Sequence, residues 1–249
     1  MMNKFEYWFL DTAIEEVIGF SWIVPDEQYG CIAINRDPLE LTVDEIANIF
    51  YKLFQKGYLL AASSEDFDNS GQIKGGFMPS LLEITAALRE EVNLGYYLTA
   101  QGGNQWETVS NPQWEQYFSW PLGIEPVNEG EIVCGSREVG ENLISMIHLL
   151  SPGNSRLEVI PGTVMWETLT PWEATYWKTL PIGYRIRYQF TYSDVEEYST
   201  FEEDEGWVEW IKNEDGRDER QPIEFVRQRQ QAQEWYRNTK RWYTNYYFQ

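Results

Sequence analysis

Four glutamates directly follow tryptophans, and this combination of residue types could do chemistry on a sugar. Most glycoside hydrolases use two carboxylates, one as proton donor and one as nucleophile or base, and aromatic rings stack on sugar faces. The glutamates are Glu107, Glu115, Glu167 and Glu173. With 40 acidic residues and 12 tryptophans in the chain, such neighbours also arise by chance. A carboxylate-dependent glycoside hydrolase is therefore the best enzymatic hypothesis, and it remains an alternative to a binding function.

Other catalytic and metal-binding patterns are missing from the sequence. His148 is the only histidine, so no second imidazole is available for a metal site. Cys31 and Cys134 lie far apart in apolar runs, which favours buried free thiols over a disulfide. The acidic stretch from Asp66 to Gly71 lacks the ligand spacing of a calcium loop, which favours a solvated loop. We therefore expect no catalytic residues, no metal and no cofactor.

Aromatic and charged residues in the second half of the chain are typical of a binding surface. Arg185 and Arg187 alternate along a predicted strand and would share one of its faces. Tryptophan and tyrosine are enriched in the hot spots of protein interfaces. The predicted partner-binding residues are Trp172, Tyr176, Trp177, Arg185, Arg187, Glu202, Glu203, Asp204 and Glu205. The alternative is an exposed sheet face that carries ordinary ion pairs.

The net charge of −21 limits the classes of partner. Nucleic acids and anionic membranes attract lysine and arginine, so an acidic surface repels them and favours a basic protein. The first residues show no basic region followed by an apolar run, and no stretch reaches the ~20 apolar residues of a membrane helix. We therefore expect a cytoplasmic protein that makes no membrane contact and binds a basic protein.

The C-terminal stretch is an exception to the acidic character. A helix predicted from Pro222 interleaves aromatic residues with lysines and arginines, so nucleic acid would contact the protein only there. Attraction of this helix to the acidic body of the chain, or formation of a homodimer, is the favoured interpretation.

Hydrophobic periodicity and turn residues predict the elements. In the first half we expect helices at 5–24, at 42–57 behind a Thr42–Glu45 capping box, and at 79–92, with strands at 31–34 and 58–62. In the second half we expect a strand at 130–135, a helix at 137–150, a hairpin at 156–167, a short aromatic helix at 170–181 and a strand at 184–190.

The segment from Tyr96 to Glu107 runs from an aromatic strand directly into the start of a helix. Thr99 can cap this helix, and the pair Gly102-Gly103 permits close packing. The sequence Tyr96-Tyr97-Leu98-Thr99-Ala100-Gln101-Gly102 resembles the motif with which many winged-helix proteins leave the second strand of the wing and enter their last helix. The resemblance implies a winged-helix-like module with an insertion at 64–92. A strand-to-helix corner in any α+β domain is the alternative.

We therefore predict an α+β fold in four parts. They are a winged-helix-like domain at 1–120, an aromatic-rich α+β domain at 121–193, an acidic linker segment at 194–216 and a basic aromatic C-terminal helix at 217–249. The favoured function is a non-enzymatic, acidic protein-binding module with an immunity-type role, in which it neutralises a basic effector, because complementary charge speeds encounter. Besides the hydrolase, the alternative is a winged-helix DNA-binding transcriptional regulator that contacts DNA through the C-terminal helix.

Overall fold

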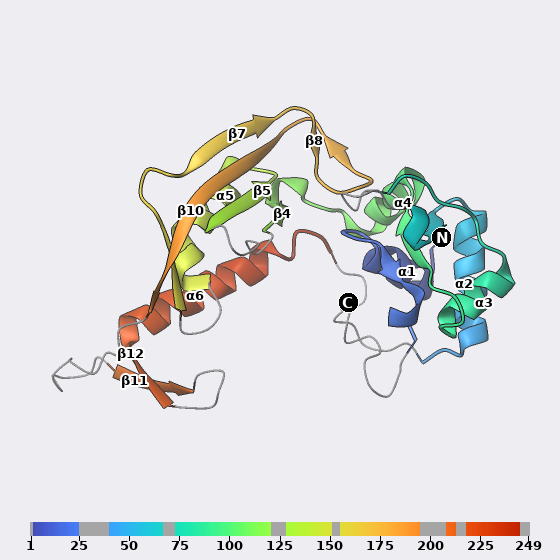
Figure 1. Ribbon diagram of the computed structural model, residues 1–249, viewed down its shortest axis with the longest axis horizontal. Coiled ribbons are helices and arrows are strands. Elements are labelled where there is room, and N and C mark those ends of the chain that lie inside the picture. The colour runs from blue at the N-terminus through green and yellow to red at the C-terminus, as the bar shows by residue number, and fades with distance from the viewer. Residues whose placement is uncertain are drawn as a thin grey trace. The chain divides into compact units, whose positions relative to one another are not determined.

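The computed structural model describes residues 2–24, 40–66, 73–120, 128–150, 155–194, 208–212 and 218–244 (Figure 1). Helices combine with antiparallel sheets, so the predicted α+β class is confirmed. The chain divides into two compact units. The first contains Met1–Pro112, Thr175–Thr179 and Thr244–Gln249, and the second contains Gln113–Ala174 and Leu180–Tyr243. The first unit is thus assembled from three separate segments of the chain.

The main division falls between Pro112 and Gln113, and the second unit includes the C-terminal helix. Strand β11 (Val208–Lys212) pairs with β12 (Asp218–Pro222), so part of the segment predicted as an acidic linker is a strand. The rest of that acidic segment, and the strand predicted at 31–34, lie almost wholly outside the described residues. Within the described ranges, no helix is long and apolar enough to cross a membrane.

The helices of the first unit begin at residues that favour helix caps. They are α1 (Lys4–Thr12), α2 (Val43–Gln55), α3 (Leu81–Leu88) and α4 (Ala100–Ser110). The capping box before α2 is confirmed, because the Glu45 N–H donates to Thr42 Oγ1 at 3.3 Å and the Thr42 N–H donates to the Glu45 carboxylate at 2.8 Å. Ser80 and Glu83 form the same box before α3, with distances of 3.3 and 2.7 Å. Local sequence therefore determines where these helices start.

The first helix is shorter than the range of 5–24 that periodicity predicts. It ends at Thr12, and strand β1 (Ile18–Gly19) and a short 3₁₀ helix at Phe20–Trp22 follow. Strand β1 pairs with β3 (Gly95–Leu98), a partner far away in the sequence. Phe20 is still buried, although it lies in the 3₁₀ helix and not in α1. The apolar residues that share one predicted helix face are therefore buried by different elements. Periodicity identifies buried positions, but it cannot detect pairing with a distant strand.

The first unit has a three-stranded antiparallel sheet in the order β1-β3-β2, with β2 at Leu59–Ala62. Aromatic rings from different elements meet at its centre. The Phe50 ring centroid lies 4.3 Å from that of Phe9, 4.9 Å from that of Phe20 and 4.7 Å from that of Tyr96. All four side chains are fully buried. This aromatic cluster is the core on which α1, α2 and the sheet are held.

One carboxylate lies in this core. Asp11 is 2% exposed, and its Oδ1 accepts hydrogen bonds from Trp106 Nε1 at 2.9 Å and from the Tyr7 hydroxyl at 3.1 Å. The Tyr7 hydroxyl also lies 3.1 Å from Ser110 Oγ, and the Thr244 N–H donates to the Ser110 carbonyl at 2.8 Å. Buried polar groups need such partners. The network joins α1, α4 and the C-terminal end of the described chain.

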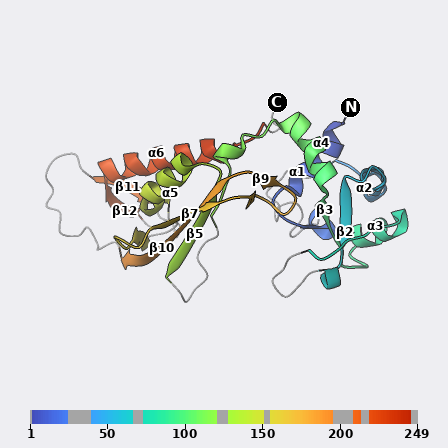
Figure 2. The same cartoon turned by 90° about the horizontal axis from the view of Figure 1, so that it is seen from above.

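The second unit is a sheet covered by helices on one face (Figure 2). Its strands are β4 (Phe118–Ser119), β5 (Glu129–Cys134), β10 (Gly183–Asp194) and β6 (Ser155–Val159), in that order, and β7 (Met165–Leu169) also pairs with β10. The helix α5 (Arg137–Leu150) has the predicted bounds, and α6 (Ile223–Thr239) packs against it. Ile132, Ile186 and Tyr188 point toward this helical layer and are buried with Leu143. The alternating residues of β5 and β10 point to the opposite face.

The hairpin predicted around Pro161-Gly162 is wrong. β6 and β7 both run antiparallel to β10, which they contact at Phe190–Asp194 and Gly183–Arg187 respectively. The Thr163 N–H donates to the Ile160 carbonyl at 3.2 Å and Gly162 has a φ of +80°, as in a type II turn. Type II turns do not match the twist of hairpin strands. The turn therefore interrupts one long edge of the sheet and does not reverse the chain.

The aromatic helix predicted at 170–181 is also wrong. This segment contains two short strands, β8 (Trp172–Glu173) and β9 (Thr179–Leu180), which pair with each other. A helix of this length has little stability of its own. Thr175 and Lys178 exchange main-chain hydrogen bonds of 3.3 Å between these strands, and Tyr176 and Trp177 in the turn bind main-chain carbonyls of the first unit.

Candidate protein-binding surface

The structure distributes the predicted binding residues over both units. Tyr176 and Trp177 belong to the first unit, whereas Trp172, Arg185 and Arg187 belong to the second. The four predicted carboxylates Glu202, Glu203, Asp204 and Glu205 lie outside the described residues.

Tyr176 and Trp177 hold the segment Thr175–Thr179 in the first unit. The Tyr176 hydroxyl donates to the Ala13 carbonyl and accepts the Leu98 N–H at 2.8 Å. Burial raises the pKa of this hydroxyl far above its ordinary value. Trp177 Nε1 donates to the Ile14 carbonyl at 2.9 Å. Both side chains thus bind main-chain groups of their own unit, which is a structural role.

Trp172 packs inside the second unit. It is 3% exposed, and its ring centroid lies 6.1 Å from that of Tyr117. A Cβ on Gly183 would lie 2.2 Å from Trp172 Cδ2, so the ring rests directly on the backbone at that glycine. This tryptophan is a core residue and presents no surface to a partner.

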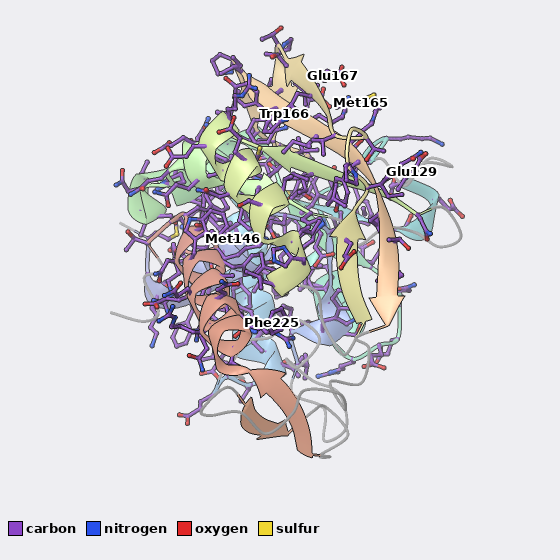
Figure 3. The ribbon with its side chains drawn as sticks, turned by 90° about the vertical axis from the view of Figure 1, so that its left-hand side faces the viewer. Glu129, Met146, Met165, Trp166, Glu167 and Phe225 are labelled. Carbon is purple, nitrogen blue, oxygen red and sulfur yellow. The ribbon has the colours of Figure 1, made fainter. Side chains whose placement is uncertain are left out.

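Arg185 and Arg187 share the face of the sheet opposite the helices, as predicted. Arg187 Nε donates to Glu131 at 3.0 Å, and Arg185 Nη1 donates to Glu167 at 2.9 Å. The hydrogen bond and the charge of Glu131 raise the pKa of the Arg187 guanidinium. Figure 3 shows Glu167 and Met165 on the edge strand of this sheet and Glu129 on another strand. Each arginine thus forms an ion pair with a glutamate on a neighbouring strand. Such pairs stabilise the strand register, and because they neutralise the arginine charge they do not favour an anion site.

The glutamates that follow tryptophans do not gather in one unit. Glu107 belongs to the first unit, where it pairs with Lys178 at 2.6 Å. Glu115, Glu167 and Glu173 belong to the second unit, and Glu167 is bound by Arg185. Among the described residues, no group of three or more histidine, cysteine or acidic side chains is arranged to hold a metal ion.

Cys134 is a buried free thiol, as predicted, whereas Cys31 lies outside the described residues. Burial raises the pKa of the Cys134 thiol to about 11, against a smaller lowering by the Gly140 and Ser136 main-chain amides. Two pKa units reduce the thiolate fraction about a hundredfold near neutral pH. In a Cys31→Ser variant at about pH 8, we expect iodoacetamide to label Cys134 at least ~100-fold more slowly in the native protein than in urea. Mass spectrometry of the labelled fraction over time measures this; comparable rates would show an accessible thiol.

Among the described residues of the first unit, the most exposed apolar surface lies at the start of α3. Four large side chains are exposed there, and we call them the α3 apolar patch. They are Phe77 (36% exposed), Met78 (56%), Leu81 (36%) and Leu82 (82%). The segment before the helix is held in place because Phe77 and Ala61 exchange main-chain hydrogen bonds of 3.0 and 2.9 Å. The patch is therefore presented on a defined backbone.

Leu81 and Leu82 both lie in the helix predicted at 79–92 and are two of its apolar residues. The buried side chains of α3 are Ile84, Ala87 and Leu88. Leu82 precedes Ile84 by two residues, which places it about 200° around the helix. The helical wheel alone therefore indicates that Leu82 cannot share the core face, and this signal would have identified the patch.

Carboxylates lie at both ends of α3. Glu83 is exposed in the first turn of α3, and Glu90 and Glu91 are exposed just beyond its C-terminus. Asp44 of α2 lies 3.8 Å from Arg89, which brings a further carboxylate to the end of α3. Hydrogen bonds from the Ser80 backbone and hydroxyl lower the pKa of Glu83, so its charge persists in mildly acidic solution. Within residues 73–93, which contain the patch and α3, the positively charged side chains are Lys74 and Arg89.

No family model, no curated protein and no solved structure matches this chain. The winged-helix resemblance therefore stays a prediction. The structure contains the strand-to-helix corner that the resemblance and its alternative both predict: β3 ends at Leu98, Thr99 caps α4 and the Gly102 N–H donates to Thr99 Oγ1 at 3.0 Å.

Proposed function

We propose that this chain is a non-enzymatic module that binds a basic protein through the α3 apolar patch and its acidic surroundings, and thereby neutralises a basic effector. The observation that carries the proposal is the exposure of Leu82 on the capped helix α3 and of Met78 just before it. Isolated apolar side chains are common on protein surfaces, but adjacent large ones rimmed by charge mark interaction sites.

The layout of the patch matches the anatomy of a protein interface. Such interfaces combine an apolar centre with a polar rim, and methionine and aromatic residues are enriched at the centre. Phe77, Met78 and Leu82 supply the apolar centre, Glu83 supplies a carboxylate in the same turn of the helix, and Glu90 lies beyond the C-terminal end of α3. Negative charge at α3, on a chain with a net charge of −21, steers basic partners toward the surface.

The proposal predicts that Leu82→Glu, combined with Met78→Glu, abolishes partner capture. Loss of two apolar contacts at the centre of an interface costs about 2–4 kcal/mol, or roughly 30- to 1000-fold in Kd. Both side chains are exposed, so the variant should fold like the wild type. The experiment immobilises wild type and variant in parallel, passes lysate of the source cells over both, and identifies the retained proteins by mass spectrometry.

Met165→Glu is the matched control, because Met165 is 64% exposed and lies in the second unit. We expect a basic protein that is retained by wild type and by Met165→Glu, released by moderate salt, and lost on the α3 variant. Retention of the same proteins by all three baits would refute a role for the α3 apolar patch, and retention of acidic proteins alone would refute the proposed partner class.

A further inference from the structure

Helix α6 carries a positively charged outer face on a strongly acidic protein. Its inner face packs within the second unit, where Val226, Ala232 and Thr239 are buried. At its C-terminal end the Lys240 ammonium lies 4.6 Å from the centroid of the Phe118 ring. Figure 3 shows α6 in the foreground, with Phe225 on it and Met146 on the neighbouring α5. The helix is thus anchored on one side, and its other side faces solvent.

The exposed side chains of α6 are almost all arginine, glutamine or asparagine. The ones that matter here are Arg227, Gln230, Gln233, Arg237 and Asn238, together with Arg241 just beyond the end of the helix. Glu234 is the carboxylate among the described side chains of this helix. A helix that only needs to be soluble on an acidic protein does not require this composition, because glutamate and lysine serve equally well.

We propose that the outer face of α6 binds duplex DNA in the major groove. Arginine binds phosphates and the O6 and N7 atoms of guanine, and glutamine and asparagine pair with the N6 and N7 atoms of adenine. Ten residues separate Arg227 from Arg237, a rise of about 15 Å, which matches about four base pairs. The wide major groove of B-form DNA admits such a helix, whereas the narrow major groove of double-stranded RNA does not.

The net charge of −21 does not prevent this contact. At physiological ionic strength charges more than about 8–10 Å apart are largely screened, so the potential at α6 is set by its own arginines and near neighbours. The acidic body instead limits the affinity, whereas the contacts of the arginines with phosphates make the affinity fall with salt. This binding surface lies in the second unit and does not depend on the α3 apolar patch of the first unit.

The test uses the full chain and a fluorescent DNA duplex of about 20 base pairs, with binding followed by anisotropy between about 50 and 200 mM salt. Three phosphate contacts give a slope of log K against log salt of about −2.7, so affinity should fall roughly 40-fold over this range. Arg237→Gln with Arg241→Gln should weaken binding about 10-fold or more at the lowest salt and reduce the slope by about 2.

Lys52→Gln with Lys74→Gln is the control, because it removes the same charge from exposed positions of the first unit. We expect this control to bind DNA like the wild type. Circular dichroism must show equal helix content in all three proteins. Absence of binding at about 50 mM salt, or equal weakening by the control, would overturn the proposal. Polyglutamate that displaces the duplex as well as unlabelled DNA does would also overturn it, because the surface would then fit an acidic protein.

Discussion

Replacing Gly102 with alanine should destabilise the first unit by about 2–4 kcal/mol, although the same exchange in an ordinary helix stabilises by about 1 kcal/mol. A Cβ on Gly102 would lie 2.0 Å from the Tyr58 carbonyl oxygen and 2.8 Å from the carbonyl carbon. Both atoms belong to the main chain, so no side-chain rotation relieves the overlap. The expected sign is therefore opposite to that of helix propensity.

The main chain at Tyr58, which a Cβ on Gly102 would meet, also binds the residue that caps α4. The Tyr58 carbonyl accepts the Thr99 N–H at 3.0 Å, and Thr99 Oγ1 donates to the Gly57 carbonyl at 2.6 Å. Displacing α4 to make room for a methyl group would stretch both hydrogen bonds and loosen the cap. The N-terminus of α4, its cap residue Thr99 and the end of β3 depend on the same hydrogen bonds. We therefore expect this one substitution to have a large effect.

The measurement must resolve the two units, because a single unfolding curve of a two-unit chain is not two-state. Native-state hydrogen exchange at Tyr96–Leu98 reports the first unit, and the amides of β5 serve as internal reference. Gly75→Ala is the matched control, since the nearest atom to its added Cβ is 3.9 Å away. Equal protection of β3 in the Gly102→Ala and Gly75→Ala variants would contradict the prediction.

Trp177→Ala should cost the first unit about 2–4 kcal/mol, because it removes a large half-buried side chain and leaves the Ile14 carbonyl without the indole donor. The Trp177 ring packs at 6.2 Å from the Trp106 ring, in an edge-on arrangement, and rests on Gly103. The segment Thr175–Thr179 belongs to the first unit, so this loss should lower protection of β3 amides and leave those of β5 unchanged.

A double-mutant cycle tests whether Trp177 causes this effect. A Cβ on Gly103 would lie 2.0 Å from Trp177 Cε3, so Gly103→Ala should be destabilising in the wild type. In the Trp177→Ala background the clash disappears, and the same exchange should become neutral or stabilising because alanine favours the helix. Additive effects of the two substitutions would show that the ring does not pack on Gly103. Ile182→Ala, at a position 44% exposed in the second unit, controls for loss of an exposed apolar side chain.

Much of the local structure follows from neighbouring residues. The capping box at Thr42 and the helix at Arg137–Leu150 form where the sequence predicts them, because caps and apolar stripes act within one or two turns. Thr99 and the following glycines were likewise identified as a strand-to-helix corner with close packing, which the contact of Gly102 with Tyr58 confirms. In these cases the interacting groups are close in sequence.

The candidate surfaces were predicted less well, for a physical reason. Tyr176 and Trp177 have the residue types of a binding hot spot, but the same properties suit them to bind main-chain carbonyls across the first unit. Their partners, Ala13 and Ile14, lie at the other end of the sequence, so composition cannot distinguish the two roles. Leu82 shows the opposite case, because its residue type suits a core position but it lies on the exposed side of α3.

The sequence by itself determined the α+β class, the helix starts with their caps, the acidic charge of the chain and the amphipathic basic helix α6. Only the tertiary structure decided that Pro161-Gly162 interrupts one edge of β10, that Thr175–Thr179 completes the first unit, and that Leu82 is exposed. Caps, charge and periodicity are properties of neighbouring residues. Strand partners and exposure depend on which set of contacts between distant segments gives the lowest free energy for the whole fold.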